Sequence, residues 1–460
     1  MFFKRLFRHG LLTFLLYSGV LSLYLISGSQ PAPRPFLWGV AVCEYQNSGA
    51  ETCKNAQWAS WEQKRGKIRH GHQSGKSCEF WDRYRDDVTL VKEMGLNAIR
   101  FSVEWSMIEP EPGVFDEAAL KHYSDLVDAA LEVGITPMAT LHHFTHPQWF
   151  EDKGAFENES NIIYFVRFCQ KVFERLNDRV PLWCTINEPG VYAFQGYIRG
   201  VFPPGKTSSS LAGKVLVNLL KAHVEVYKTL KGMRGGQEAQ IGIVHQHMLF
   251  EPYHEDSALE KNFCWYLSQL MSTAVFDFFK TGIFTYRVIP VVDCFLGGFS
   301  LSPFSQTIMY EDATACKALD FIGLNYYSHV LINWKSPAKP AYREGDIVTD
   351  MYYAAYPEGL YRAIAEMSEL KVPVYITENG IADSRDDRRA QFIESYLIAM
   401  QKAIEDGYDV RGYFYWTLMD NFEWDEGFGM KFGLCSVDYQ TQERSVREGA
   451  HALLNVAHSA

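Results

Sequence analysis

Eight short apolar runs, separated by amphipathic segments, are the feature of this sequence that most restricts its fold. They span residues 36–42, 98–105, 136–143, 182–188, 240–247, 320–327, 372–379 and 411–419. The runs are continuously apolar rather than strictly alternating, which is typical of strands that are covered on both faces in a parallel sheet. Eight such strands predict the α/β class and, within it, a (β/α)8 barrel, also called a TIM barrel.

The segments between these runs have helical periodicity and recognisable ends. Asp116 is placed to cap a helix whose apolar residues recur at helical spacing until Gly134 stops it. A second apolar stripe runs through residues 162–176 and leads into the next strand. Strand, helix and strand in this order require parallel pairing with right-handed crossovers. No Gly-x-Gly-x-x-Gly turn follows the first run, which argues against an open dinucleotide-binding sheet.

Residues 35–460 contain no Pro- or Ser-rich linker, so we expect one domain with long loops on its catalytic face. The longest loops are expected at residues 50–77 and 290–318. Hydrophobic residues make up 47% of the chain and charged residues 22%, which is typical of a globular protein with a large core. A net charge of −11 argues against nucleic acid as a partner, because a phosphate backbone is held by clustered cations.

The first 34 residues differ in character from the rest. Lys4, Arg5 and Arg8 precede an uncharged apolar stretch at residues 11–26, and a Pro-rich spacer follows it. A basic start before a short apolar run is typical of an export signal or a membrane anchor. We therefore expect residues 1–34 to take the barrel out of the cytoplasm, as a cleaved signal peptide or as an anchor through residues 11–26. The alternative is an N-terminal helix packed on a cytoplasmic domain.

The nine cysteines are an odd number without metal-binding spacing. Cys43, Cys53 and Cys78 lie near one another in the sequence, so a disulfide between two of them is open in an oxidising compartment. Three others lie in apolar runs and are expected to be single buried thiols: Cys169, Cys184 and Cys264.

Two glutamates stand where the reactive groups of a (β/α)8 barrel are expected, at the carboxyl ends of strands. The fourth run ends with Asn187 and Glu188, and the seventh with Glu378 and Asn379. Two carboxyl groups facing each other across a barrel mouth suit glycoside cleavage, because one protonates the departing oxygen while the other attacks the anomeric carbon. From the residues alone, two ordinary surface glutamates remain the alternative.

A metal centre is the rival interpretation of the polar strand ends. His142, His143 and His146 cluster after the third run, but they have no matching His or carboxylate at helical spacing. Chemistry with two carboxyl groups needs no metal and no cofactor, and we expect neither.

At these same residues the sequence resembles glycoside hydrolase family 1, the β-glucosidase family. The similarity extends from residue 36 to about residue 444, in seven ordered segments that begin at Phe36, Trp81, Arg100, Thr185, Gly323, Val374 and Tyr415. The resemblance implies a retaining β-glycosidase with Glu188 as general acid/base and Glu378 as nucleophile. It also implies that Arg100 and Tyr327 support the charge of Glu378, and that Asn187 holds the 2-hydroxyl of the sugar.

The resemblance further implies a set of sugar-binding residues, namely Gln46, His143, Asn187, Asn325, Tyr327, Trp416, Glu423 and Trp424. Trp416 would form the stacking floor, although its place in an apolar run favours a core residue when the residues are considered alone. A carboxylate at Glu423 attracts hydroxyl groups and repels a 6-phosphate, so unphosphorylated β-glucosides or β-galactosides are the expected substrates.

The chain departs from the family's pattern after Gln46, after His143 and at Gly190, where the family often has an aromatic residue. These departures concern the leaving-group side of the site and not the two carboxylates. A transglycosidase, which passes the sugar to an acceptor other than water, would use the same pair. A non-catalytic, membrane-tethered sugar-binding barrel would have lost one of them, and both are present.

Overall fold

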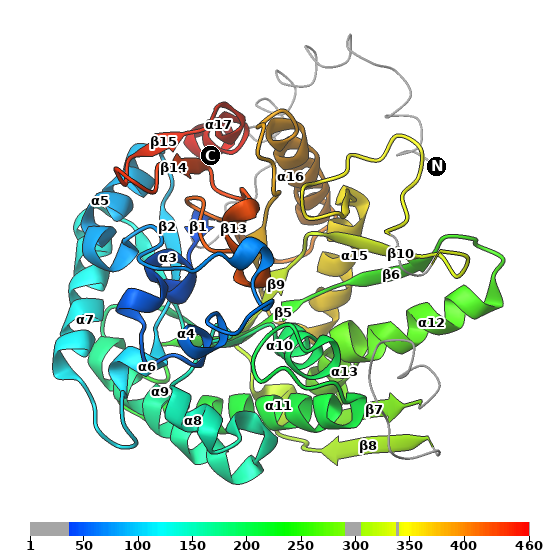
Figure 1. Cartoon of the computed structure of the whole chain (residues 1–460), viewed down its shortest axis with the longest axis horizontal. Coiled ribbons are helices and arrows are strands. Elements are labelled where there is room, and N and C mark those ends of the chain that lie inside the picture. The colour runs from blue at the N-terminus through cyan, green and yellow to red at the C-terminus, as the bar shows by residue number, and fades with distance from the viewer. Residues whose placement is uncertain (1–35, 290–304, 337–339, 460) are drawn as a thin grey trace.

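The computed structural model describes residues 36–289, 305–336 and 340–459, and eight parallel strands close a barrel at its centre (Figure 1). The strands follow one another around the barrel in the order β1, β13, β12, β9, β5, β4, β3 and β2. Their bounds are Leu37–Ala41 (β1), Ala98–Ser102 (β2), Thr136–Thr140 (β3), Leu182–Asn187 (β4), Gln240–Gln246 (β5), Phe321–Asn325 (β9), Val374–Asn379 (β12) and Val410–Trp416 (β13). Seven lie within the predicted runs and β13 begins one residue before the eighth run, which confirms the predicted (β/α)8 fold.

Closure of the barrel follows from the pairing of its first and last strands. β1 pairs in parallel with β13 along five residues, from Leu37 opposite Gly412 to Ala41 opposite Trp416, and with β2 on its other edge. Gly39 is required at this seam, because a Cβ there would lie 2.6 Å from the Phe414 ring. The barrel strands are almost entirely buried, which explains their continuous apolar sequence.

Helices form the outer layer, and both predicted helices are confirmed. α7 (Glu117–Glu132) begins after Asp116, whose carboxylate accepts hydrogen bonds from the backbone N–H groups of Ala118 and Ala119. Gly134, with φ +77°, follows its end. The other helices around the barrel are α5 (Phe80–Glu93), α9 (Ile162–Leu176), α11 (Ser209–Lys231), α13 (Ala274–Thr281), α15 (Pro357–Met367), α16 (Arg389–Glu405) and α17 (His451–Ser459).

Shorter elements follow the strands on the side where the glutamates lie. They are the helices α3 (Glu44–Thr52), α4 (Gln57–Trp61), α6 (Trp105–Ile108), α8 (Gln148–Asp152), α10 (Pro189–Phe194) and α12 (Ala258–Ser268), the π-helical turn η5 (Gln269–Thr273), and the strands β6 (Leu249–Pro252), β10 (Ser328–Ile332), β11 (Ala354–Ala355), β14 (Cys435–Val437) and β15 (Arg444–Val446). β6, β10 and β11 form a small separate sheet beside the barrel mouth.

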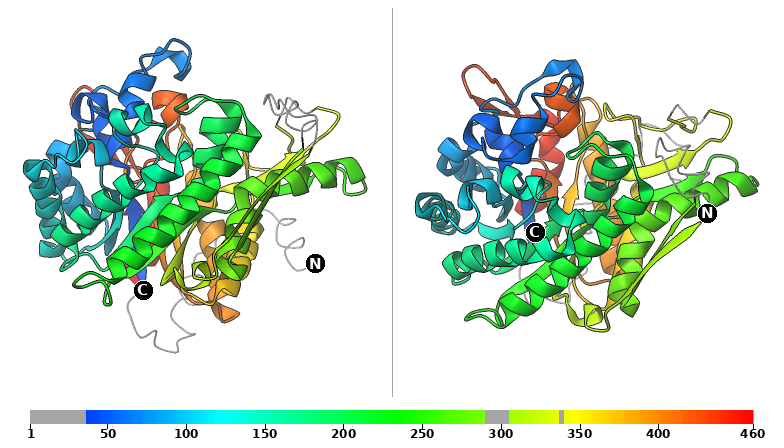
Figure 2. Two further views of the ribbon diagram at one scale, coloured as in Figure 1. Left: turned by 90° about the horizontal axis from the view of Figure 1, so that it is seen from below. Right: turned by 60° about the horizontal axis from the view of Figure 1, so that its bottom comes forward.

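The predicted loop at residues 290–318 is partly wrong. Residues 290–304 lie outside the described part, but β8 (Gln306–Glu311) follows them and pairs antiparallel with β7 (Ile283–Val288). This hairpin lies against α11 (Figure 2). β8 carries mostly exposed side chains, so it lacks the apolar run by which the barrel strands were identified. The other predicted loop, at residues 50–77, contains the end of α3, the helix α4 and the 3-10 helix η1 (Arg69–Gly71), and its other residues form turns and irregular structure.

The disulfide left open among Cys43, Cys53 and Cys78 is wrong, because all three are buried free thiols. Their sulfur atoms face different neighbours, and that of Cys78 lies 2.9 Å from the backbone oxygen of Asp420. The predicted single buried thiols Cys169, Cys184 and Cys264 are confirmed.

The N-terminal segment, residues 1–34 with the apolar stretch 11–26, lies outside the described residues. Among the helices that are described, none is both long and apolar enough to cross a membrane.

Candidate active site

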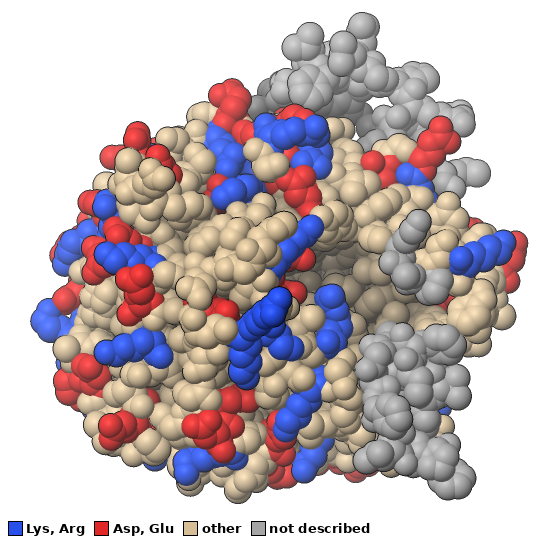
Figure 3. Space-filling view, in the orientation of Figure 1, with Lys and Arg blue, Asp and Glu red and all other residues tan. Residues whose placement is uncertain are grey.

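Glu188 and Glu378 line one cavity of about 520 Å³ at the carboxyl ends of the strands. Figure 3 shows the molecule hollowed at the middle of this face. Glu378 lies within β12, whereas Glu188 directly follows β4 in a left-handed conformation (φ 48°) and precedes α10. Both side chains are buried. The pair predicted from the strand ends is therefore brought to a single site.

Glu378 is held by one cation and one hydroxyl. Its Oε1 lies 2.5 Å from Nη1 of Arg100, and the hydroxyl of Tyr327 donates to its Oε2 at 2.6 Å. Burial alone would lower the pKa of Arg100, but the charge of Glu378 raises it above its usual value. A fixed guanidinium and a hydroxyl donor both favour a carboxylate over a carboxylic acid. Glu378 is thus prepared to act as a nucleophile.

Glu188 is in the opposite electrostatic environment. Burial, and then the charge of Glu378, raise the pKa of Glu188 well above its ordinary range. Its Oε1 accepts a hydrogen bond of 2.6 Å from the amide of Asn325, which opposes this shift without cancelling it. Two carboxyl groups whose surroundings separate their protonation states are the expected arrangement of an acid and a nucleophile.

A network of side-chain amides connects the surroundings of Glu378 with those of Glu188. Oδ1 of Asn187 accepts from Arg100 at 2.6 Å and from Asn325 at 3.3 Å, while its amide nitrogen lies 3.2 Å from Nε2 of His143. Burial, and then the charge of Arg100, lower the pKa of His143, so the ring is neutral and accepts this hydrogen bond. Thr377 donates to Asn325 at 2.7 Å, which sets the orientation of that amide.

The remaining predicted residues lie on the other side of the cavity. Gln46 donates to Glu423 at 3.1 Å. Burial first, and then the nearby charge of Glu378, raise the pKa of Glu423 to about 8. Trp424 lines the cavity and stacks on Tyr45, with ring centroids 6.1 Å apart and an interplanar angle of 7°. Trp416 also lines it, so this residue ends a core strand and presents a ring to the cavity.

All of the predicted site residues are therefore in the cavity wall or hydrogen-bonded to it, and the roles assigned to them stay predictions. The rival metal centre has little support in the structure. His142 and His146 contact each other at 3.3 Å, but the described part of the chain contains no group of three or more His, Cys, Asp or Glu side chains that could hold a metal ion.

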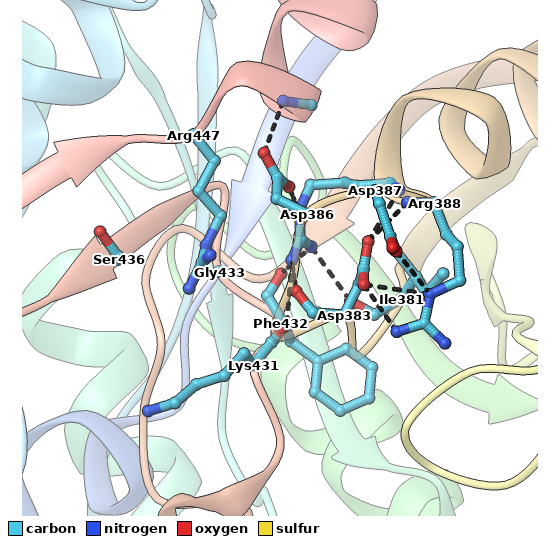
Figure 4. Close-up of polar contacts among 12 residues, drawn as sticks. Ile381, Asp383, Asp386, Asp387, Arg388, Lys431, Phe432, Gly433, Ser436 and Arg447 are labelled. Carbon is cyan, nitrogen blue, oxygen red and sulfur yellow. Dashed lines mark hydrogen bonds and ion pairs between the residues drawn. The ribbon is translucent and has the colours of Figure 1, made fainter.

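Arg389 was missed by sequence reasoning. It is buried at the start of α16, and its Nη1 donates to the backbone oxygens of Ile381 and Phe432 and to the hydroxyl of Tyr415. It thereby joins the loop that follows β12 to the segment that carries Phe432, a residue of the cavity wall. Figure 4 shows both segments, with Ile381 and Phe432 labelled. In the sequence, Arg389 follows several charged residues and has the pattern of a solvated surface. Only the fold shows that it is enclosed.

Comparison with known proteins agrees with this geometry. The model of glycosyl hydrolase family 1 matches residues 29–460. β-Glucosidase A of Thermotoga maritima is 32% identical over 443 residues, which cover 92% of this chain and 97% of that protein. A β-galactosidase of Pyrococcus woesei is 29% identical over 498 residues, covering 90% and 94% of the two chains. The structure of a β-glycosidase from Pyrococcus horikoshii superimposes with a TM-score of 0.79 and 38% identity, over 93% of this chain and 95% of that one. The chain belongs to glycosyl hydrolase family 1.

Proposed function

We propose that this family 1 glycoside hydrolase cleaves β-linked, unphosphorylated glucose or galactose with retention of configuration, through a covalent glycosyl-enzyme. The observation that carries the proposal is that Glu188 and Glu378 line one cavity, where Glu378 is ion-paired with Arg100 while burial and the charge of Glu378 raise the pKa of Glu188. One of the relatives described above is a β-glucosidase and another a β-galactosidase, which supports both sugars as candidates.

In the first step, the protonated Glu188 donates its proton to the glycosidic oxygen while the carboxylate of Glu378 attacks the anomeric carbon. The leaving group departs as a neutral alcohol, and the sugar remains as an ester on Glu378. Esterification removes the negative charge that had raised the pKa of Glu188. Glu188, left as a carboxylate by that proton transfer, takes a proton from water while the water oxygen attacks the anomeric carbon, which breaks the ester, releases Glu378 as a carboxylate and restores the protonated Glu188.

The preference for a sugar without phosphate rests on Glu423. Its neighbours are the amide of Gln46 and the carboxyl groups of Glu378 and Asp425, and this environment favours neutral hydroxyl groups over a phosphate dianion. A transglycosidase would share every step up to the glycosyl-enzyme, and the products formed in plain buffer and with added alcohol distinguish it from a hydrolase.

Trapping of the intermediate tests the assignment of the two glutamates. A 2-deoxy-2-fluoro-β-glucoside with a dinitrophenyl leaving group slows both steps but still reacts with a good nucleophile, so the sugar should accumulate on the protein. Peptide mapping is expected to find it on Glu378. A fully active enzyme that carries the label on another residue, or never carries it, contradicts the mechanism.

The location of the enzyme is a separate proposal. Residues 1–34 combine a basic start, an apolar stretch at 11–26 and a Pro-rich spacer, and we propose that they export the barrel or anchor it to the outer side of a membrane. Fractionation of native cells and sequencing of the mature N-terminus test this. Full-length protein with Met1 intact in the soluble cytosol would contradict it.

A further inference from the structure

Beyond the two glutamates, one wall of the cavity is apolar. It is built from α10, the connection between β5 and β6, β6 itself, η5 and β10, and its side chains are Val191, Phe194, Met248, Phe250, Met271 and Ile332. We call these six residues the apolar wall. Since Glu188 belongs to the same cavity and stands directly before α10, a group leaving from the sugar is released alongside this wall.

Gly190 allows the apolar wall to form. A Cβ at this position would lie 2.9 Å from the backbone oxygen of Leu270 and 3.5 Å from the Cα of Met271, so no aromatic side chain fits there. The backbone of η5 takes up that space and brings Met271 to the cavity. The place next to the acid where an aromatic ring could have stacked on a second sugar is thus occupied by a methionine.

The two methionine segments are fixed to each other by one hydroxyl. Ser272 donates to the backbone oxygen of Met248 at 2.9 Å and accepts from the backbone nitrogen of Met248 at 3.1 Å. The backbones of the two segments are therefore held together, while the side chains of Met248 and Met271 can still change conformation. Methionine is unbranched and polarizable, so such a surface adapts to flexible apolar ligands.

Polar residues that line the outer part of the cavity are largely engaged elsewhere. Arg199 donates to Gln195 at 3.2 Å, Glu426 is paired with Arg69 at 2.6 Å, and His329 contacts Glu251 at 2.6 Å. Gln246 and His247 are exceptions, since the side-chain oxygen of Gln246 and Nδ1 of His247 are buried without a hydrogen-bond partner within the described residues. These two groups can serve the oxygen of a leaving alcohol and one neighbouring polar group, but they cannot satisfy the several hydroxyl groups of a second sugar.

We propose that the preferred leaving group is a flexible apolar alcohol of several carbons, which lies along the apolar wall, and not a second sugar. This inference rests on the proposed glycosidase activity and names its substrate class. Burial of one methylene group is worth up to about a fourfold change in binding, so the effect accumulates along an alkyl chain.

A homologous series of n-alkyl β-D-glucosides, from ethyl to octyl and below the micellar concentration, provides the test. Primary alcohols in this range leave with similar chemical ease, so kcat/KM reports contacts of the chain. We expect kcat/KM to rise by about two- to fourfold per methylene until the wall is covered, and to exceed the value for cellobiose. A flat series, or cellobiose as the better substrate, overturns the inference.

Substitutions in the wall localise the effect. Met271→Gln and Met248→Gln keep the length of the side chain but add a polar amide, and they should lower the octyl-to-ethyl ratio of kcat/KM by about tenfold or more. Met309→Gln is the matched control, because Met309 is 61% exposed on β8 and lies outside the cavity lining. An unchanged ratio in folded wall variants contradicts the proposal. Should a variant fail to fold, the series on the unmodified enzyme still decides.

The proposed glycosidase activity and the proposed apolar leaving group can be refuted separately. β-Glucosyl fluoride has no leaving chain that could touch the wall, so its turnover tests the glycosidase activity alone. Turnover of the fluoride together with a flat alkyl series refutes only the apolar leaving group. No turnover of any of these substrates by folded enzyme refutes the proposed function and the inference together.

Discussion

Neutralising Glu378 should lower the pKa of Glu188, which is the most direct consequence of the buried pair. The carboxylate of Glu378 is the largest influence on Glu188 after burial itself. In a retaining glycosidase the two carboxyl groups stand about 5.5 Å apart, and two charges at this distance interact by about 3 kcal/mol at an effective dielectric constant of about 20. We therefore expect the pKa of Glu188 to fall when that charge is removed.

The sign follows from the charges. A negative neighbour disfavours ionisation of Glu188 and raises its pKa, so loss of the neighbour's charge lowers it. The cation Arg100 adds to the fall, because it is no longer neutralised by Glu378. Burial remains, and the pKa should stay above the ordinary value of a glutamate.

Two forms of the protein allow the measurement. One is the variant Glu378→Gln, and the other is the unmodified enzyme trapped as its 2-fluoroglycosyl ester. The ester also removes the charge of Glu378, and the bound sugar covers Arg100, so this form replaces the variant if Glu378→Gln loses stability. Carbon-13 NMR of labelled glutamate side chains reports each pKa, and the Glu188→Gln substitution identifies the resonance. In the free enzyme, the alkaline limb of kcat/KM gives the reference value. An unchanged or higher pKa of Glu188 in both forms would show that the two glutamates are not coupled, and it would contradict the proposed catalytic cycle.

Three further outcomes are expected. Glu188→Ala should lower kcat/KM for alkyl β-glucosides by about 10²- to 10⁴-fold but far less for dinitrophenyl glucosides, because a good leaving group needs no proton; equal losses in steady-state kinetics would remove Glu188 as the acid. Glu423→Ser should lower kcat/KM for neutral β-glucosides by about ten- to a hundredfold, and the unmodified enzyme should prefer neutral over 6-phospho substrates; the reverse preference would be incompatible with the reasoning above. Asp116→Ala removes the acceptor of the N–H groups of Ala118 and Ala119 and should lower the free energy of unfolding by about 1 kcal/mol in urea titrations, with kinetics unchanged.

The barrel could be predicted because its strands are buried on both faces and therefore leave continuous apolar runs. The strands that were missed leave no such pattern. Among the described strands, β8 for example pairs only with β7, carries mostly exposed side chains and has the sequence Gln-Thr-Ile-Met-Tyr-Glu. Closeness in sequence also proved a poor guide to disulfides, because Cys43, Cys53 and Cys78 each face a different part of the core.

Within the site, residues at strand ends could be predicted because the barrel fixes where strand ends meet. Met271 could not be predicted in this way, because it reaches the cavity from a helical turn that packs on Gly190, 81 positions earlier in the chain. Arg389 could not be predicted either, since most of its partners are backbone oxygens, and these leave no trace in a sequence. Contacts between loops that are distant in the sequence can be identified only in the folded structure.

Charge balance explains why these residues occur together in a buried site. Before reaction, the anion Glu378 is compensated by Arg100, while Glu188 is kept protonated. After Glu378 is esterified, Glu188 has given its proton to the leaving group and carries the negative charge in its place. Because an uncompensated buried charge is strongly unfavourable, a single negative charge that moves between the two glutamates lets both steps proceed without a change in the net charge of the cavity.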